Sequence, residues 1–375
     1  MLEWIFWGSL AGIAYTTLGY PALLWVCARL APRPVRKGAE LHSVSVIIAA
    51  HNEAGVILQK LESCVSLDYP ADRLEILIGT DGCTDPTDDR ISEFLSSRAA
   101  GSRPVIRHFR FNGRMGKPAT LNQLVPAAQG EILIFTDARQ RVAPDAARRL
   151  VEDFADPVVG AVSGELILVR NGGGWNSFGH GIGAYWDYEK FIRQKESQVG
   201  SVVGVTGALY ALRRRLYRPL DPQTILDDVE VPLQVISQGY RVAFESSALV
   251  FDQAARGGQE EFRRKVRTLT GNYQVFSRYP HLLLPGSPIG WQFWSHKLLR
   301  TVVPLWLACI FLSSLWLPGP FYRAAVVGQV IFYGMAALGW GPAYLFCLLN
   351  LSTVVGLYRF LRGNQPVTWE KTHAS

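Results

Sequence analysis

Short apolar runs alternate with amphipathic stretches between residues 43 and 168, and this alternation predicts strands that alternate with helices. The expected strands cover residues 43–50, 74–79, 104–109 and 131–136, and the expected helices cover residues 54–66, 88–97, 118–128 and 144–154. Alternation at this spacing is typical of a parallel sheet that is covered on both faces by helices.

The pattern becomes mixed between residues 159 and 280. It predicts strands at residues 160–169, 202–212 and 241–251, and helices at residues 184–199, 224–238 and 260–276. We therefore expect one α/β domain over residues 43–280, with a mixed, mainly parallel sheet.

A nearly uncharged run from Trp4 to Leu30 is long enough to span a bilayer. A secretory signal carries its positive charges before the apolar run, whereas here Arg33, Arg36 and Lys37 follow it. We interpret residues 1–42 as an uncleaved membrane anchor with a basic linker. The positive-inside rule then places the N-terminus outside and the following domain in the cytoplasm.

Three further apolar runs lie in residues 281–375, which we interpret as an interfacial helix and about three transmembrane segments. The runs cover residues 302–317, 324–340 and 343–361. Three crossings would leave Arg359, Arg362 and Lys371 outside, against the positive-inside rule. Either one short run is re-entrant or the charge rule fails in this region, and the sequence leaves both possibilities open.

The formal net charge of +7 first suggests a nucleic-acid ligand, but its distribution argues against one. Residues 44–280 contain as many acidic as basic residues, so the whole excess lies beside the apolar runs. That distribution is typical of membrane flanks. A transporter is also disfavoured, because Glu370 is the only acidic residue after position 280. The five cysteines form no C-x-x-C pair, so neither a zinc site nor a disulfide framework is expected.

Polar residues follow three of the expected parallel strands. They are His51, Asn52 and Glu53 after the first strand, Asp81 to Asp85 after the second, and Asp137 after the fourth. Ligands of open α/β sheets bind beyond the carboxyl ends of the strands, where these residues converge. The sequence therefore predicts one site at this edge of the sheet.

The residue types at this edge suit a nucleotide and its phosphates. Asp81 before Gly82 either accepts hydrogen bonds from a base or ribose, or forms a common Asp-Gly turn. A lone carboxylate such as Asp137, together with substrate phosphates, is a usual binding site for Mg²⁺ or Mn²⁺. Arg139 beside it is either a phosphate contact or a solvated loop residue.

Two further groups could complete the chemistry. Asp227 and Asp228 start a predicted helix. They either supply one general base between them or form an acidic pair that the helix dipole stabilises. Lys117 at a helix N-terminus is either a diphosphate contact or a solvated lysine. Arg264 and Arg267 share a helix face, where they either reach one diphosphate or face an anionic membrane.

Taken together, residues 43–280 resemble the family 2 glycosyltransferases with a GT-A fold, especially membrane-embedded cellulose, hyaluronan, chitin-oligosaccharide and poly-N-acetylglucosamine synthases. Residues 44–53 look like the opening strand and donor-binding turn of that family, and residues 116–122 look like its Gly-Lys-x-x-x-Leu-Asn segment. The resemblance implies a nucleotide-sugar donor, expected to be UDP-linked. It also implies these donor-binding residues: Glu53, Asp81, Lys117, Asp137, Arg264 and Arg267.

The resemblance also assigns the metal, the base and the acceptor site. Asp137 matches the first aspartate of the D-x-D metal motif, which implies Mg²⁺ or Mn²⁺, although Arg139 stands where the second aspartate is expected. Asp228 matches the catalytic base of the T-E-D motif. Gly207 and Asp227 are the implied acceptor-binding residues.

The chain departs from the family at the Q-x-x-R-W motif, where Arg264 replaces Gln and Thr268 replaces Trp. Loss of that Trp weakens the case for a processive synthase and leaves room for a lipid acceptor. The resemblance implies an inverting membrane glycosyltransferase acting on a glycan or lipid hydroxyl, in contact with membrane lipids, at the cytoplasmic face of a bacterial inner membrane. The alternative is a catalytically impaired membrane module that binds nucleotide sugars or lipids.

Overall fold

The computed structural model describes residues 1–169, 177–253, 257–284 and 286–368. The chain divides into two compact units, and each is described by itself. The sheet unit comprises Arg33–Asn171, Gly200–Ala254 and Pro366–Ser375, and the helical unit comprises Met1–Pro32, Gly172–Val199 and Ala255–Gln365.

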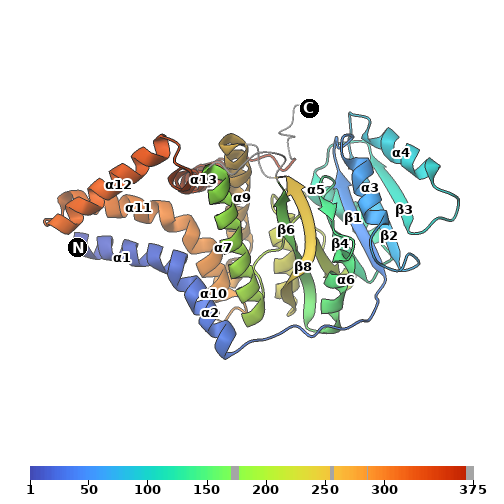
Figure 1. Cartoon of the computed structure of the whole chain (residues 1–375), viewed down its shortest axis with the longest axis horizontal. Helices are drawn as coiled ribbons and strands as arrows, with labels where there is room; N and C mark the ends of the chain where they lie inside the picture. Colours follow the sequence, from blue (N-terminus) through green and yellow to red (C-terminus); the bar gives the residue numbers. More distant parts are fainter. Residues whose placement is uncertain (170–176, 254–256, 285, 369–375) are drawn as a thin grey trace. The chain divides into compact units, whose positions relative to one another are not determined.

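The sheet unit is built on one mixed sheet of eight strands in the order β3-β2-β1-β4-β7-β6-β8-β5 (Figure 1). The strands are β1 (Val44–Ala50), β2 (Leu74–Asp81), β3 (Val105–Phe111), β4 (Ile132–Phe135), β5 (Arg141–Val142), β6 (Val159–Val169), β7 (Tyr210–Arg213) and β8 (Arg241–Gln253). The four pairs β3–β2, β2–β1, β1–β4 and β6–β8 are parallel, and the other three are antiparallel. The predicted mixed, mainly parallel sheet is thus confirmed.

Helices separate the strands, as the alternation predicts. They are α3 (Ile57–Val65), α4 (Thr87–Ser97), α5 (Lys117–Ala127), α6 (Ala146–Glu152) and α8 (Asp227–Ser237), with short 3₁₀ turns η2 (Asp153–Ala155) and η3 (Arg214–Leu216). All seven residues of β1 are buried, which is typical of a central parallel strand with helices on both faces. The buried core joins β1, β2 and β4 to the apolar faces of α3 and α6.

One expected strand, residues 202–212, is mostly irregular, since β7 begins only at Tyr210. The preceding apolar segment is buried, and its backbone bonds to groups of β8, β6 and α8 without forming a continuous strand ladder. Val205 N–H donates to the Asp228 carbonyl, and Thr206 N–H donates to Ser163 Oγ, each at 2.9 Å. Gly204 and Gly207 interrupt the run, so its apolar character reflects burial and not an extended strand.

The helical unit contains α1 (Leu2–Ala14), α2 (Tyr20–Leu30), α7 (Ser177–Val199), α9 (Gly258–Arg278), α10 (Gly290–Gln292), α11 (Leu299–Trp316), α12 (Pro320–Ala337) and α13 (Gly341–Arg362), with a 3₁₀ turn η4 (Pro280–Leu283). Two π-helical turns, η1 (Tyr15–Gly19) and η5 (Phe293–Leu298), lie inside otherwise continuous helices. By length and composition, three helices in the described part of the chain could cross a membrane: Leu2–Leu30, Gly290–Trp316 and Gly341–Arg362. α12 covers most of the second expected apolar run, residues 324–340, but it is not among the three helices that could cross a membrane.

The segment that follows α13 returns to the sheet unit at Pro366. A Cβ at Gly116 would lie 3.6 Å from Val367 Cγ1 and 3.9 Å from Thr368 Cγ2, which is ordinary contact distance. The end of the described chain therefore rests on the turn before α5.

Candidate active site

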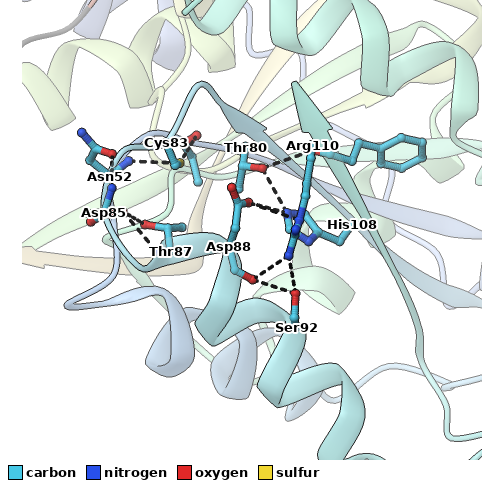
Figure 2. Close-up of polar contacts among 11 residues, drawn as sticks. Asn52, Thr80, Cys83, Asp85, Thr87, Asp88, Ser92, His108 and Arg110 are labelled. Carbon is cyan, nitrogen blue, oxygen red and sulfur yellow. Dashed lines mark hydrogen bonds and ion pairs between the residues drawn. The ribbon is translucent and has the colours of Figure 1, made fainter. Parts of the chain in front are cut away.

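The loops after β1 and β2 are fastened to each other at the carboxyl edge of the sheet (Figure 2). The Asn52 side-chain oxygen accepts the N–H groups of Thr84 and Asp85, at 2.7 and 3.2 Å. Asn52 has a positive φ of 55°, a conformation in which Asn is one of the more readily accommodated residue types. Asp85 in turn accepts the N–H of Ala54 at 3.1 Å. The two loops thus form one rigid wall.

Glu53 lies in this wall, between β1 and α3. Its carbonyl accepts the N–H groups of Val56 and Ile57 at 3.0 and 2.9 Å, so its backbone starts the first turn of α3. Its predicted contact with the donor stays a prediction.

The outer end of the wall is tied to β3 and α4. His108 Nε2 lies 3.0 Å from Thr80 Oγ1 and 3.1 Å from Asp88 Oδ1, and Arg110 donates to Ser92 Oγ at 2.6 Å (Figure 2). Burial lowers the pKa of His108, although the Asp88 carboxylate opposes that effect. This cluster stabilises the edge of the sheet that supports the two loops.

Asp81 is the last residue of β2 and is buried. One carboxylate oxygen accepts the Met115 N–H at 2.6 Å, and the other accepts the Gly116 N–H at 2.8 Å. Its carbonyl accepts a hydrogen bond from His51 Nδ1 at 2.6 Å. Asp81 therefore fixes the turn that leads into Lys117, and its predicted contact with a nucleotide stays a prediction.

Lys117 is the first residue of α5, and its ammonium bridges two carboxylates. Nζ lies 2.9 Å from Asp137 Oδ1 and 2.9 Å from Asp227 Oδ2. Burial opposes the charge on Lys117, but the two carboxylates outweigh it and raise the Lys117 pKa well above its usual range. The structure thus brings together three residues that the sequence predicted for one site from distant positions.

Asp137 follows β4 and is ionised in this arrangement. Burial alone would raise the pKa of its carboxyl group, but Lys117, with smaller contributions from Arg139 and Lys60, lowers that pKa below its usual value. The side chain of Asp137 is 37% exposed, so an incoming ligand can reach the carboxylate.

Lys60 of α3 stabilises the turn that carries Asp137. Lys60 is buried, and its ammonium donates to Thr136 Oγ1 at 2.6 Å and to the Gln140 carbonyl at 2.9 Å. The Thr136 hydroxyl in turn donates a hydrogen bond to the Ala208 carbonyl at 2.8 Å. Burial lowers the pKa of Lys60. The sequence analysis missed Lys60, because nothing in an amphipathic helix distinguishes a lysine that points inward.

Arg139, which stands where the D-x-D motif has its second aspartate, is paired with Asp252 of β8. Asp252 Oδ2 accepts hydrogen bonds from Arg139 Nη2 and Gln140 Nε2, both at 3.0 Å. The pairing follows from the antiparallel register of β5 and β8, in which Arg141 faces Phe251. The sequence analysis missed Asp252, since only this register reveals its partner.

Asp228 begins α8 and lies against Gly207. A Cβ at Gly207 would come within 3.0 Å of Asp228 Oδ2, so only glycine leaves the carboxylate its present position. Tyr210 of β7 is buried near this pair and is stacked on Phe135, with 4.7 Å between ring centroids. Burial, followed by the nearby Asp227 and other acidic groups, raises the pKa of the Tyr210 phenol. The predicted base, Asp228, and the predicted acceptor residues, Gly207 and Asp227, therefore lie next to one another.

We expect Gly207→Ala to lower kcat by about tenfold or more for the sugar transfer that the resemblance implies, because the added methyl group displaces the Asp228 carboxylate. UDP affinity, measured by calorimetry, is expected to stay unchanged. Gly328→Ala is the control, since no atom lies within 4 Å of a Cβ at that helical position. Wild-type kcat in Gly207→Ala would show that this contact does not position Asp228.

Arg264 and Arg267 lie on α9, in the helical unit. Arg264 donates to Glu261 Oε2 at 2.5 Å, so part of its donor capacity is used within the helix. The predicted contact of both arginines with the donor diphosphate stays a prediction.

The described residues contain no group of three or more His, Cys, Asp or Glu side chains that could hold a metal ion. Mg²⁺ and Mn²⁺ do not require such a group when phosphates of the substrate supply the other ligands. Asp137 fits that second arrangement, because it is ionised, accessible and the single carboxylate on its turn.

Comparison with known proteins identifies residues 45–220 as a match to the family described as Glycosyl transferase family 2. Probable glycosyltransferase YdaM of Bacillus subtilis (strain 168) is 29% identical over 249 residues, which cover 64% of this chain and 57% of the relative. Beta-monoglucosyldiacylglycerol synthase of Synechocystis sp. (strain ATCC 27184 / PCC 6803 / Kazusa) is 25% identical over 329 residues, 84% of this chain and 66% of the relative. The chain thus spans less than two thirds of the length of either relative.

A solved structure has the same fold over almost the whole chain. It is the mannosyltransferase PcManGT from Pyrobaculum calidifontis in complex with GDP-Man and Mn²⁺, with a TM-score of 0.76 and 22% identity, covering 97% of this chain and 100% of that one. The solved structure and the sheet order agree in giving this chain a GT-A-like fold, and residues 45–220 within it match the glycosyl transferase family 2 model.

Proposed function

We propose that the protein transfers a sugar from a UDP-sugar to a hydroxyl group of a membrane lipid, with inversion at the anomeric carbon. The observation that carries the proposal is the Lys117 bridge between Asp137 and Asp227, with Asp228 next in the chain. A cation that suits a leaving diphosphate is thus placed beside a carboxylate that suits an attacking hydroxyl.

In the proposed step, Asp228 accepts the proton of the acceptor hydroxyl while the oxygen of that hydroxyl attacks the anomeric carbon of the donor sugar. The bond from that carbon to the diphosphate oxygen breaks, and UDP leaves with the bonding electron pair. Lys117 stabilises the charge that develops on the diphosphate, and we expect Arg267 to assist it. Asp137 would hold Mg²⁺ or Mn²⁺, which neutralises diphosphate charge when bound.

Two observations favour a lipid over a glycan as acceptor. Of the two relatives named above, the beta-monoglucosyldiacylglycerol synthase matches the larger share of this chain. Its name gives diacylglycerol as the lipid that is glucosylated. Thr268 stands where polymer-forming members have the Trp that cradles an acceptor sugar. Diacylglycerol and UDP-glucose are therefore the first substrates to test.

The test is a UDP-release screen with the full-length protein in phosphatidylglycerol vesicles, with and without diacylglycerol. We expect release to depend on the lipid acceptor and a glycolipid to appear by mass spectrometry. Release that depends instead on added oligosaccharide would favour the glycan acceptor. A chain that binds UDP but transfers no sugar from any donor would favour the catalytically impaired module.

We further propose a topology with three crossings, in which the sheet unit is cytoplasmic. The helices Leu2–Leu30, Gly290–Trp316 and Gly341–Arg362 would cross, whereas α12 would not. The contact of Val367 with the Gly116 turn supports this count, because it returns the chain after α13 to the side of the sheet unit. Arg359 and Arg362 then obey the positive-inside rule, and the conflict found in the sequence disappears.

Cysteine labelling in intact cells tests this topology. With the native cysteines replaced, a cysteine at position 365 is expected to react with an impermeant maleimide only after the cells are opened, and a cysteine at Met1 is expected to react before. A cysteine at Ala39, an exposed position of the basic linker, reports the cytoplasmic side as a control. Labelling of position 365 from outside would restore a fourth crossing through α12.

A further inference from the structure

Tyr210 is a fully buried phenol at the candidate site, and its hydroxyl has no hydrogen-bond partner among the described residues. A buried hydroxyl that lacks a partner costs free energy, so such groups are uncommon in folded proteins. The proposed transfer step does not use this hydroxyl. Its surroundings therefore have to show which group it serves.

The register of the sheet places Tyr210 beside the ion-paired groups of the site. Tyr210 is the first residue of β7 and pairs with Phe135, the last residue of β4, on which its ring is stacked. Asp137 follows Phe135 by two residues, just beyond this stack. Lys117 joins Asp137 to Asp227, the first residue of α8. The phenol thus lies at the carboxyl edge of the sheet, next to the Lys117 bridge.

A second phenol at this position is already committed to a partner. Tyr217 is stacked on the other neighbour, Phe135, with 6.2 Å between ring centroids, and its hydroxyl donates to Asn122 Oδ1 at 2.8 Å. The same oxygen accepts the Leu220 N–H at 2.8 Å. Of the two phenols that are stacked on Phe135, that of Tyr210 is therefore the one that can donate to a further group.

Asp227 is the acidic group that affects this phenol most. Burial raises the pKa of Tyr210, and the Asp227 carboxylate raises it further, ahead of Tyr217, Asp228 and Asp137. The hydroxyl therefore keeps its hydrogen at neutral pH and can act as a donor. In the structure, Asp227 Oδ2 is paired with the Lys117 ammonium at 2.9 Å.

A bound diphosphate would compete with Asp227 for Lys117. The ammonium has three hydrogens to donate, and both Asp137 and Asp227 already lie within 2.9 Å of it. Asp227 is only 7% exposed, so water replaces a weakened ion pair incompletely. A buried carboxylate that loses its cation is costly unless another donor takes its place. The Tyr210 hydroxyl is such a donor.

We propose that Tyr210 is a positioning residue for Asp227, and that its hydroxyl donates a hydrogen bond to the Asp227 carboxylate when Lys117 contacts the donor diphosphate. Asp227 then stays ionised and in place beside Asp228, while Lys117 stabilises the leaving group. The hydrogen stays on the phenol throughout. This proposal rests on the proposed function, because it requires a diphosphate that competes for Lys117.

The first test needs no nucleotide. Lys117→Met removes the cation permanently, so Tyr210 should bond to Asp227 in that variant. Thermal unfolding of the full-length protein in detergent micelles is measured for Tyr210→Phe in the wild-type and Lys117→Met backgrounds. We expect no loss of Tm in the wild-type background, where no hydrogen bond is removed, and a loss of about 3 °C or more in the Lys117→Met background.

Tyr69→Phe is the matched control for that comparison. Tyr69 is also buried in the sheet unit, but its hydroxyl donates to the His42 carbonyl at 2.6 Å, at the amino edge of the sheet. Tyr69→Phe should lower Tm equally in both backgrounds. Equal effects of Tyr210→Phe in the two backgrounds would overturn the proposal, since its hydroxyl would then not respond to the loss of Lys117.

The second test measures UDP affinity by calorimetry. We expect Tyr210→Phe to weaken UDP binding about tenfold, which is the usual size for a hydrogen bond to a charged group. In an Asp227→Asn background the same change should have no effect, because a neutral amide does not need a replacement for the ion pair. An undiminished loss in that background would overturn the proposal, since the hydroxyl would then serve another group.

The two tests decide independently. If Lys117→Met does not fold, the UDP comparison decides alone. If the wild type binds neither UDP nor GDP, the proposed function fails, and the thermal comparison still decides whether Tyr210 responds to the loss of Lys117.

Discussion

Replacing Asp228 with asparagine is expected to lower sugar transfer by about 10²–10⁴-fold while UDP affinity is retained. Asparagine has nearly the same size, so it preserves the packing against Gly207 but cannot accept the proton of the acceptor hydroxyl. The backbone bond from Val205 N–H to the carbonyl of residue 228 is also preserved. The loss should therefore appear in kcat and not in donor binding.

The measurement compares UDP release and glycolipid formation at saturating donor. Asp221→Asn is a matched control, because Asp221 is an exposed carboxylate shortly before α8, and it should leave both rates unchanged. Substantial transfer by Asp228→Asn would contradict the assignment of the base. In that case Asp227 would be the next candidate, although its carboxylate is paired with Lys117.

The sheet and the edge of the site were predictable from local sequence. β1, β2 and β4 are short apolar runs, and polar residues mark the carboxyl end of each run. Asp81 and Asp137 could therefore be located before the structure was known. Their partners could not, since no local period links Asp81 to the N–H groups of Met115 and Gly116.

The rest of the site depends on register and on long-range charge pairing. Asp252 reaches Arg139 only because β5 pairs with β8 in one register, and a shift of one residue would turn Asp252 to the other face. The contacts of His296 with Glu189 and Glu196 in the helical unit, at 3.0 and 2.8 Å, were missed for a different reason. The sequence places His296 in a presumed interfacial segment and Glu189 in the α/β domain, and nothing local relates them.

Lys117→Met is expected to lower kcat/KM by about 10²–10³-fold and to weaken UDP binding. Methionine preserves much of the side-chain volume but removes the ammonium that lies 2.9 Å from both Asp137 and Asp227. The variant therefore loses a diphosphate contact and leaves two neighbouring carboxylates without their shared cation. The second effect predicts a change in pH dependence that loss of a phosphate contact alone would not produce.

The direction of that change follows from the lowered pKa of Asp137. A carboxyl group with a lowered folded pKa stabilises the protein above its ordinary pKa of about 3.9, and this contribution is lost as the pH falls through the lowered value. Without Lys117 the pKa of Asp137 rises, so the acid limb of both activity and thermal stability should move to higher pH. The raised pKa of Lys117 stabilises the folded protein below the ordinary pKa of lysine, and this contribution to stability is lost only as the pH rises through the raised value.

Two controls separate the charge of Lys117 from its shape. Lys117→Arg keeps a cation that can contact both carboxylates, so it should keep the wild-type acid limb even if donor binding weakens. Arg148→Ala removes a cation from an exposed pair with Asp68, 3.1 Å apart, and should alter neither quantity. A wild-type acid limb in Lys117→Met would mean that Asp137 and Asp227 do not depend on Lys117 for their charge. Another cation would then have to balance them, and Arg139, already drawn toward Asp252, would be the first to examine.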